Sequence, residues 1–293
     1  MDVGGTKIAA SIVDSNGHAR SKVKVSTEQH DTARSIAQVA AMAHRVAEES
    51  GVSWREISAI GVAVPGIYYT ATGQVWAPNL PGWDHIPLRD ELAAKLPAPI
   101  VIDSDRAAYV SGEQWLGAAR GLTDVIFLAV GTGIGAGIIS GGRLIRGAGD
   151  IAGAVGWFAL DPRTKEIYQR VGCFEAESAG PALARKAGGG TTTEAIIENA
   201  RQGDMAARQI VNETIQYLAM GVANLVSVLN PQMIVLGGGL MQAGDLFLEP
   251  LRREMLQWAQ PIAARQVRIE LSALGEDAGL LGAARLAFLG TEA

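Results

Sequence analysis

The sequence predicts an α/β protein that is built from two similar halves. The strongest indication is a pair of glycine-rich turns, at residues 2–7 and 128–139, each lying between short apolar runs. Turn residues between apolar runs are typical of a strand, a turn and a second strand. Each of these hairpins is followed by further strand and helix patterns. Because 48 % of the 293 residues are apolar and 19 % are charged, we expect a globular chain with substantial cores.

The first half opens on its glycine turn at once. A strand before this turn would contain almost no residues, whereas strands normally have about five; either the start site is misassigned or the strand is short. A helix at 32–50 follows from the helical spacing of its apolar residues, Ile36, Val39, Ala40, Ala43 and Val46. The expected elements are strands at 7–13, 19–25, 57–64 and 100–102, helices at 32–50 and 88–95, and a turn at 14–17.

The second half repeats the plan with longer helices. A helix starts at Asp103-Ser-Asp105 and runs to about Leu116, and residues 140–180 are expected to be irregular. The other expected elements are strands at 125–130, 136–139, 233–236 and 267–271, a turn at 141–142, and helices at 181–187, 193–202, 204–229, 246–258 and 279–289. We expect a small N-terminal domain of residues 1–107 plus the C-terminal helix 279–293, and a large domain of residues 108–278.

Composition excludes several classes of function. The net charge is −5 and no basic stretch stands out, which argues against nucleic acid as a partner. The apolar stretches are broken by glycine and are too short to span a bilayer, and no signal peptide is visible. The lone cysteine, Cys173, cannot form an internal disulfide. We therefore expect a cytoplasmic protein.

The glycine turns favour phosphate binding. Glycine accepts positive φ and lets backbone N–H groups approach an anion closely, so two such turns could hold one polyphosphate from both sides. A dinucleotide fingerprint does not fit, because a strand rather than a helix follows the mid-chain turn. A Walker A loop does not fit either, because Lys7 is followed by Ile8. The alternative is a pair of tight hairpins without a ligand.

Four segments resemble motifs of one family. Asp2-Val-Gly-Gly-Thr-Lys7 and Gly131-Thr-Gly-Ile-Gly135 resemble its two phosphate motifs, residues 228–240 its adenosine motif, and Ala77-Pro-Asn-Leu-Pro-Gly-Trp83 its sugar-contacting loop. Over nearly its whole length the chain is similar to the ROK family of sugar kinases, part of the actin-like/hexokinase superfamily. The resemblance implies a two-domain actin-like/ribonuclease H-like ATPase fold, with duplicated halves around an interdomain cleft.

The resemblance also implies an activity and a set of site residues. It implies glucokinase-like, ATP-dependent phosphorylation of a sugar hydroxyl, the 6-position of a hexose or modified hexose, by a cytoplasmic homodimer. ATP would bind with Mg²⁺, which Asp2 would orient through water. The nucleotide and phosphate contacts would be Asp2, Gly4, Gly5, Thr6, Lys7, Gly131, Thr132, Gly133, Gly237, Gly238 and Gly239. The expected sugar contacts include Asn79, Ser104, Asp105 and Glu175.

Asp105 is the expected catalytic base. Phosphorylation of a hydroxyl needs a base near the acceptor oxygen, and Asp105 lies where a strand gives way to a helix. The alternative role for an aspartate at this place is an N-cap. The family usually has Asn-Asp here, whereas this chain has Ser104-Asp105; a serine has one donor where asparagine has two.

The chain departs from the family pattern at the sugar side. Where the family typically has Gly-Glu-Ile-Gly-His, this chain has Gly153-Ala-Val-Gly-Trp157. Ala154 and Trp157 therefore stand where a glutamate and a zinc-binding histidine contact the sugar. Only residues 172–175 match the end of the cysteine-rich zinc loop, and all four histidines lie in the first third of the chain. We expect no zinc, a more apolar pocket and poor use of glucose.

Two alternatives stay open. One is a catalytically weak, ROK-like sugar-binding or regulatory protein, although DNA-binding members carry a helix-turn-helix segment for which we expect no room before residue 2. The other is a kinase that uses polyphosphate or a non-sugar acceptor.

Overall fold

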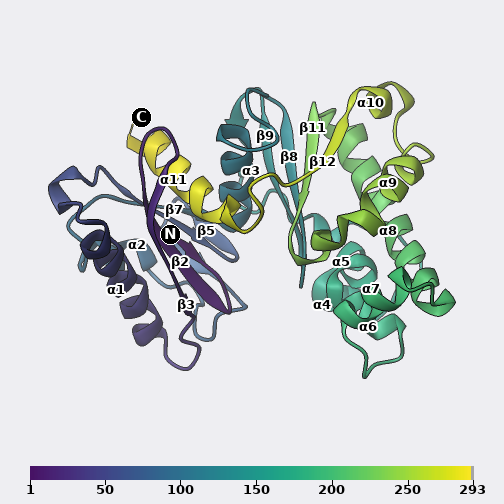
Figure 1. The fold of residues 1–293 in the computed structure, drawn as a ribbon, viewed down its shortest axis with the longest axis horizontal. Coiled ribbons are helices and arrows are strands. Elements are labelled where there is room, and N and C mark those ends of the chain that lie inside the picture. Colours follow the sequence, from purple (N-terminus) through teal and green to yellow (C-terminus); the bar gives the residue numbers. More distant parts are fainter. Residues whose placement is uncertain (292–293) are drawn as a thin grey trace. The chain divides into compact units, whose positions relative to one another are not determined.

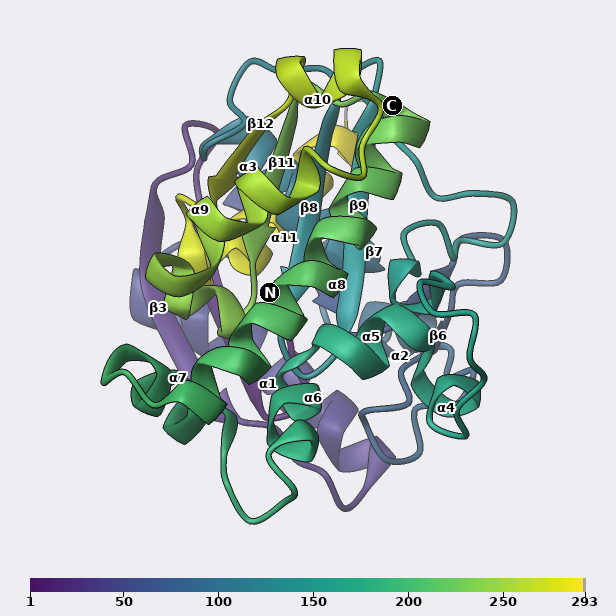
Figure 2. The same cartoon turned by 90° about the vertical axis from the view of Figure 1, so that its right-hand side faces the viewer.

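The computed structural model describes residues 1–291, which form two compact units (Figures 1 and 2). The first unit comprises Met1–Gly121, Arg146–Ala152 and the described residues from Glu276 onward; the second comprises Leu122–Ile145 and Gly153–Gly275. Each unit contains one five-stranded sheet with helices packed on it, so the expected α/β duplication is confirmed. The expected domain boundary near residue 107 remains a prediction. The C-terminal helix expected at 279–293 includes residues 292–293, which lie outside the described residues.

The sheet of the first unit has the order β3-β2-β1-β4-β7. Its strands are β1 (Asp2–Val3), β2 (Lys7–Val13), β3 (Ala19–Ser26), β4 (Ile60–Val64) and β7 (Ile100–Ser104). β1 is antiparallel to β2 and parallel to β4, which is parallel to β7. The carboxyl ends of β1, β4 and β7 therefore share one edge, where open α/β sheets bind ligands.

The helices of the first unit cover this sheet. They are α1 (Thr32–Ser50), α2 (Leu88–Ala93), α3 (Asp105–Trp115) and α11 (Ala278–Thr291). The α1 boundaries follow from local chemistry, since the Asp31 side chain accepts from the Arg34 N–H and Gly51 ends the helix in the left-handed region. A small hairpin of β5 (Ile67–Tyr69) and β6 (Gln74–Trp76), which the sequence did not predict, completes the unit together with the 3₁₀ turns Trp54–Glu56 and Gly275–Asp277.

The second unit repeats the sheet plan with the order β10-β9-β8-β11-β12. Its strands are β8 (Val125–Val130), β9 (Ile134–Ser140), β10 (Arg143–Leu144), β11 (Met233–Gly237) and β12 (Arg268–Leu271). β8, β11 and β12 are parallel, and β9 and β10 extend the sheet antiparallel. Figure 2 shows the long helix α8 (Met205–Leu229) in front of β8 and β9.

Shorter helices complete the second unit. They are α4 (Tyr168–Val171), α5 (Cys173–Ser178), α6 (Gly180–Lys186), α7 (Thr193–Arg201), α9 (Gly244–Met255) and α10 (Pro261–Gln266), with 3₁₀ turns at Val155–Trp157 and Gly239–Ala243. The irregular conformation expected for 140–180 is wrong at α4 and α5. Both helices are held by tertiary packing, in which Phe174 is fully buried against α8. Among residues 1–291, none of the helices combines the length and apolarity needed to cross a bilayer.

Candidate active site

The first glycine turn, residues 4–6, joins β1 to β2 at the carboxyl edge of the first sheet. The Gly4 N–H donates to the Lys7 carbonyl at 2.9 Å, and the Thr27 hydroxyl donates to the Gly4 carbonyl at 2.7 Å. A Cβ on Gly5 would lie only 3.3 Å from the Asn79 carbonyl oxygen. The structure thus brings Asn79, an expected sugar contact, next to the first phosphate turn.

Lys7 has a partner that the sequence did not indicate. Its Nζ lies 3.2 Å from Oε2 of Glu276, which also accepts from Lys24 Nζ at 2.7 Å. Hydrogen bonds from Lys24 and Lys7 lower the pKa of Glu276 to about 2. All three side chains are solvent-accessible, so this network leaves the Lys7 ammonium within reach of an incoming anion.

Ser104, rather than Asp105, caps α3. The Ser104 hydroxyl oxygen accepts from the Ala107 N–H at 3.2 Å, which satisfies one of the free donors at the helix start. Asp105 is the first helical residue, and its Oδ1 accepts from the Arg106 N–H at 2.7 Å. The alternative role of Asp105 as the N-cap is therefore wrong, and a carboxylate remains for chemistry at the carboxyl end of β7.

The electrostatic environment poises Asp105 near neutral pH. Burial raises the pKa of Asp105 to about 7; Arg106 opposes this shift and Asp2 adds to it. Burial also raises the pKa of Asp2, against the amino terminus, Lys7 and Lys24. Gly279 makes room for Asp2, since a Cβ there would collide with the Asp2 carboxylate. A carboxylate with a pKa near 7 is suited to act as a general base.

An ion pair between the buried Asp103 and the exposed Arg146 flanks Asp105. Asp103 Oδ2 accepts from Arg146 Nε at 2.9 Å and from Nη2 at 2.6 Å, and Asp103 Oδ1 accepts from the Ser104 N–H at 2.8 Å. Arg146 begins the segment that returns to the first unit, and this segment is also held by Asp150, which accepts from the Thr70 N–H at 2.9 Å. The sequence did not predict this pair, whose partners are 43 residues apart.

The second glycine turn, residues 131–133, joins β8 to β9 in the second unit. The Gly131 N–H donates to the Gly133 carbonyl at 3.0 Å, and the Gly180 N–H donates to the Gly131 carbonyl at 2.8 Å. Glu175 Oε2 accepts from the Ile134 N–H at 2.8 Å, and a Cβ on Gly133 would approach the same oxygen to 2.8 Å. Burial raises the pKa of Glu175, and this hydrogen bond opposes the shift. Glu175, expected at the sugar, thus also fixes the turn.

The glycines after β11 lie beside this second turn. Gly237 pairs with Ala129 in the parallel ladder, and a Cβ on Gly131 would lie 3.5 Å from the Gly239 nitrogen. Gly238 has φ +91° and leaves only 2.5 Å between a Cβ and the Val130 carbonyl oxygen, so this position requires glycine. The expected second phosphate and adenosine motifs therefore meet at one edge of the second sheet.

Comparison with known proteins decides the family. Residues 1–288 match the family model described as ROK family. The chain belongs to the ROK family. A glucokinase from Thermotoga maritima is 31 % identical over 310 residues, which cover 98 % of this chain and 95 % of the relative. An N-acetylmannosamine kinase from Escherichia fergusonii is 31 % identical over 296 residues, which cover 98 % and 97 %.

A solved structure supports the same assignment. The ROK family glucokinase from Streptomyces griseus, in complex with glucose and AMPPNP, is 31 % identical, with a TM-score of 0.82 over 99 % of this chain and 98 % of that one. The expected fold class, the actin-like ATPase fold, is confirmed by this likeness.

Ala154 and Trp157 of this ROK chain lie around a 3₁₀ turn of the second unit. Ala154 precedes the turn Val155–Trp157, and the residue Trp157 is 56 % exposed. The backbone of Trp157 lies against Gly172, where a Cβ would approach its Cα to 2.7 Å. The indole is therefore not a core residue, and it is available to a ligand.

A polar network holds the segment that follows Trp157. Glu177 Oε1 accepts from Lys165 Nζ at 2.6 Å and from the Tyr168 hydroxyl at 2.5 Å, and Asp161 accepts from Arg163 Nε at 3.0 Å. Glu177 and Glu175 both belong to α5, so this network also fixes the helix that carries Glu175. The expected lack of zinc stays a prediction.

A Mg²⁺ ion would need oxygen ligands from the protein, from phosphates or from water. In the described part of the chain, no group of three or more His, Cys, Asp or Glu side chains is arranged to hold a metal ion. The charge of Asp2 raises the pKa of Asp105, and the charges of Asp105 and Asp2 add to the burial that raises the pKa of Tyr109. Two such carboxyl groups fit a cation that arrives with nucleotide phosphates and keeps most of its water shell.

The expected site residues divide between the units. The first unit brings together Asp2, Gly4, Gly5, Thr6, Lys7, Asn79, Ser104 and Asp105, and the second holds Gly131, Thr132, Gly133, Ala154, Trp157, Glu175, Gly237, Gly238 and Gly239.

Proposed function

We propose that this ROK protein is an ATP-dependent sugar kinase. Its acceptor is a hydroxyl of a hexose or modified hexose, and we propose the 6-hydroxyl. The observation that carries the proposal is Asp105, a carboxylate at the carboxyl end of β7 that does not cap α3 and whose pKa burial raises to about 7. The sugar kinases among its relatives and the AMPPNP complex of the Streptomyces griseus glucokinase support the same reaction.

The proposed mechanism assigns each step to residues of this chain. Asp105 accepts the proton of the acceptor hydroxyl, whose oxygen forms a bond to the γ-phosphorus as the bond to the β,γ-bridging oxygen breaks and ADP leaves. Ser104 and Asn79 orient the acceptor by hydrogen bonds. Backbone N–H groups of the two glycine turns hold the phosphates. Mg²⁺ bound with ATP would supply charge neutralisation.

We further propose that the acceptor carries a substituent that an indole can cover. Trp157 offers an exposed apolar surface, and Ala154 offers no polar group. A sugar hydroxyl directed at this surface would lose its hydrogen bonds, which costs about 1–3 kcal/mol for each buried unpaired group. An N-acetyl, deoxy or bulky substituent there avoids this loss. Glucose should then be a poorer substrate than such a modified hexose, by roughly one to three orders of magnitude in kcat/KM.

A substrate panel tests both proposals. ADP release is measured with glucose, 2-deoxyglucose, mannose, N-acetylglucosamine and N-acetylmannosamine, with ATP or polyphosphate as donor and Asp105→Asn as the inactive control. We expect ATP-dependent turnover that is highest with a modified hexose. Efficient glucose phosphorylation would overturn only the proposal that the acceptor carries a substituent covered by Trp157. Sugar binding without turnover by any donor would overturn the kinase proposal itself and favour a regulatory member.

A further inference from the structure

The turn from β7 into α3 is held by three consecutive side chains, each of which accepts a hydrogen bond from a backbone N–H. Asp103 Oδ1 accepts from Ser104 at 2.8 Å, the Ser104 hydroxyl oxygen from Ala107 at 3.2 Å, and Asp105 Oδ1 from Arg106 at 2.7 Å. Such bonds between side chains and nearby backbone fix the local conformation of a chain. The position of the Asp105 carboxylate therefore depends on its two neighbours.

Asp103 differs from the other two side chains because it also needs a counter-charge. Its side chain is only 8 % exposed, whereas that of Arg146 is 41 % exposed. A carboxylate withdrawn from water is unfavourable unless it is paired and hydrogen-bonded. Arg146 supplies this partner, with Nε at 2.9 Å and Nη2 at 2.6 Å from Oδ2.

The geometry of this pair leaves one oxygen of Asp103 for the turn. A guanidinium commonly binds a carboxylate as a fork, with one N–H to each oxygen. Here both donors of Arg146 go to Oδ2, and Oδ1 accepts from the Ser104 N–H. The two oxygens therefore have separate partners, and Arg146 holds the carboxylate that holds the turn.

The segment that carries Arg146 is itself held in shape. The Ala152 N–H donates to the Arg146 carbonyl at 2.9 Å, which closes residues 146–152 into a loop. Asp150 accepts from the Thr70 N–H at 2.9 Å and from the Thr70 hydroxyl at 3.1 Å. An arginine on a closed and anchored loop loses less conformational freedom when it pairs than one on a free loop.

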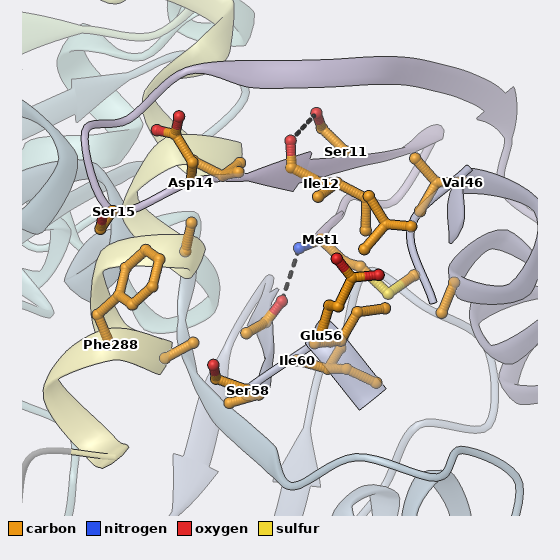
Figure 3. Close-up of a pocket in the computed structure, with 18 of the residues that line it drawn as sticks. Met1, Ser11, Ile12, Asp14, Ser15, Val46, Glu56, Ser58, Ile60 and Phe288 are labelled. Atoms are coloured by element: carbon orange, nitrogen blue, oxygen red, sulfur yellow. Dashed lines mark hydrogen bonds between the residues drawn. The ribbon is translucent and has the colours of Figure 1, made fainter. Parts of the chain in front are cut away.

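A cavity of about 340 Å³ in the first unit lies apart from this turn (Figure 3). Figure 3 shows Ile60, at the start of β4, among its lining residues together with Val46 of α1 and Phe288 of α11. Neither Asp103 nor Arg146 lines it. Because β7 is parallel to β4, the turn after β7 lies at the opposite edge of the sheet. A substitution in this cavity can therefore lower the stability of the unit without touching the turn.

We propose that Arg146 is a positioning residue for the phosphoryl transfer, and that it acts by holding the Asp103 carboxylate that fixes Ser104 and Asp105. This inference rests on the proposed function, in which Ser104 orients the acceptor and Asp105 takes its proton. Small displacements of such groups slow a reaction strongly. ATP is assigned to the glycine turns, so its binding should not depend on Arg146.

Kinetics with the best acceptor of the substrate panel test this proposal. Arg146→Met leaves the buried Asp103 carboxylate without its counter-charge, so we expect kcat to fall by roughly 10- to 100-fold and the acceptor KM to rise. The KM for ATP should stay within about twofold of the wild-type value. Val46→Ala, which enlarges the cavity, should lower the melting temperature but not kcat. Wild-type kcat in Arg146→Met, or an equal fall in Val46→Ala, would overturn the proposal.

A double variant tests whether Arg146 acts through Asp103. Asparagine needs no counter-charge, and its Oδ1 can still accept from the Ser104 N–H. Asp103→Asn alone should be impaired like Arg146→Met, because its amide also has to meet the guanidinium donors. Asp103→Asn with Arg146→Met should recover kcat to within about threefold of wild type. A double variant as slow as Arg146→Met would show that Arg146 only anchors its own loop, and the proposal would be wrong.

Amide exchange distinguishes failure of this proposal from failure of the proposed function, because it needs no substrate. Exchange of the Ser104 N–H should be about tenfold or more faster in Arg146→Met and should return toward the wild-type rate in the double variant. Equal exchange in Arg146→Met and wild type would refute the role of Arg146, even if no sugar is phosphorylated. If Arg146→Met does not fold, Arg146→Lys replaces it, since lysine keeps the charge but not the paired donors. Slower turnover and faster exchange than wild type would then support the proposal, and a wild-type value of either would overturn it.

Discussion

Replacing Asp105 with asparagine tests the proposed base, because the change should damage activity and improve stability. Asparagine keeps the size of the side chain and the acceptor for the Arg106 N–H, but it cannot take a proton at neutral pH. We expect kcat to fall by roughly 10²- to 10⁴-fold, the usual contribution of a general base. ATP and acceptor binding should change little.

The pKa of Asp105 sets the pH dependence of the wild-type enzyme. With a folded-state pKa of about 7, the base is about one-tenth ionised at pH 6, so kcat should drop roughly tenfold between pH 8 and pH 6. The linked effect on stability has the opposite sign. The pKa lies above its ordinary value of 3.8, so the stability that protonation contributes is present below pH 3.8 and is lost as the pH rises through 7.

The magnitude follows from the same shift. About three pKa units correspond to up to about 4 kcal/mol, reduced where solvent reaches the carboxyl group. At pH 8 the neutral asparagine should therefore unfold at higher denaturant than the wild type, and at pH 4 the two should be similar. Urea unfolding at both pH values and a coupled ADP assay are the measurements. Wild-type turnover in the variant, or equal stability at pH 8, would refute the assignment of Asp105 as a desolvated base.

Four further predictions concern the second unit, metals and assembly. Glu175→Ala should weaken AMPPNP binding about tenfold by calorimetry, because the Ile134 N–H loses its acceptor, whereas Glu175→Gln should restore binding; equal affinities would contradict this role. Trp157→His with Ala154→Glu should shift the kcat/KM ratio toward glucose in competition assays, and an unchanged ratio would remove Trp157 from specificity. Elemental analysis should find no stoichiometric zinc, and turnover should require added Mg²⁺. One zinc per chain would show that the prediction of no zinc site in the 157–175 segment is wrong. Light scattering at micromolar protein should give a dimer, and a monomer alone would count against it.

The parts of the fold that the sequence predicted are those with local causes. The helix at 32–50 has its own apolar face and cap, and both glycine hairpins consist of adjacent strands. The strand-to-helix change at Asp105, on which its proposed role rests, could be predicted because it is local too. The role of Ser104 as the cap was missed, since either residue of the pair has a side chain that can cap a helix.

The parts that the sequence did not predict depend on distant partners. Asp103 and Arg146 meet only because the 146–152 segment returns to the first unit, and Lys7 meets Glu276 only because α11 packs near β2. Neither pair has a periodicity or a short-range spacing. The helix α5 was missed for a similar reason, because it spans six residues and depends on packing against α8.

In each unit a glycine leaves space for a carboxylate beside the glycine turn of the sheet. In the first unit Gly279 leaves the space that Asp2 occupies, and in the second Gly133 leaves the space that Glu175 occupies. In both cases a methyl group on the glycine would meet a carboxylate oxygen, so the position of the acid requires glycine at its neighbour. The two carboxylates have different effects. Asp2 adds to the negative charge around the proposed base, whereas Glu175 accepts a hydrogen bond from a backbone N–H of the second glycine turn. Changes in the first pair should therefore act on kcat and its pH dependence, and changes in the second pair on nucleotide affinity.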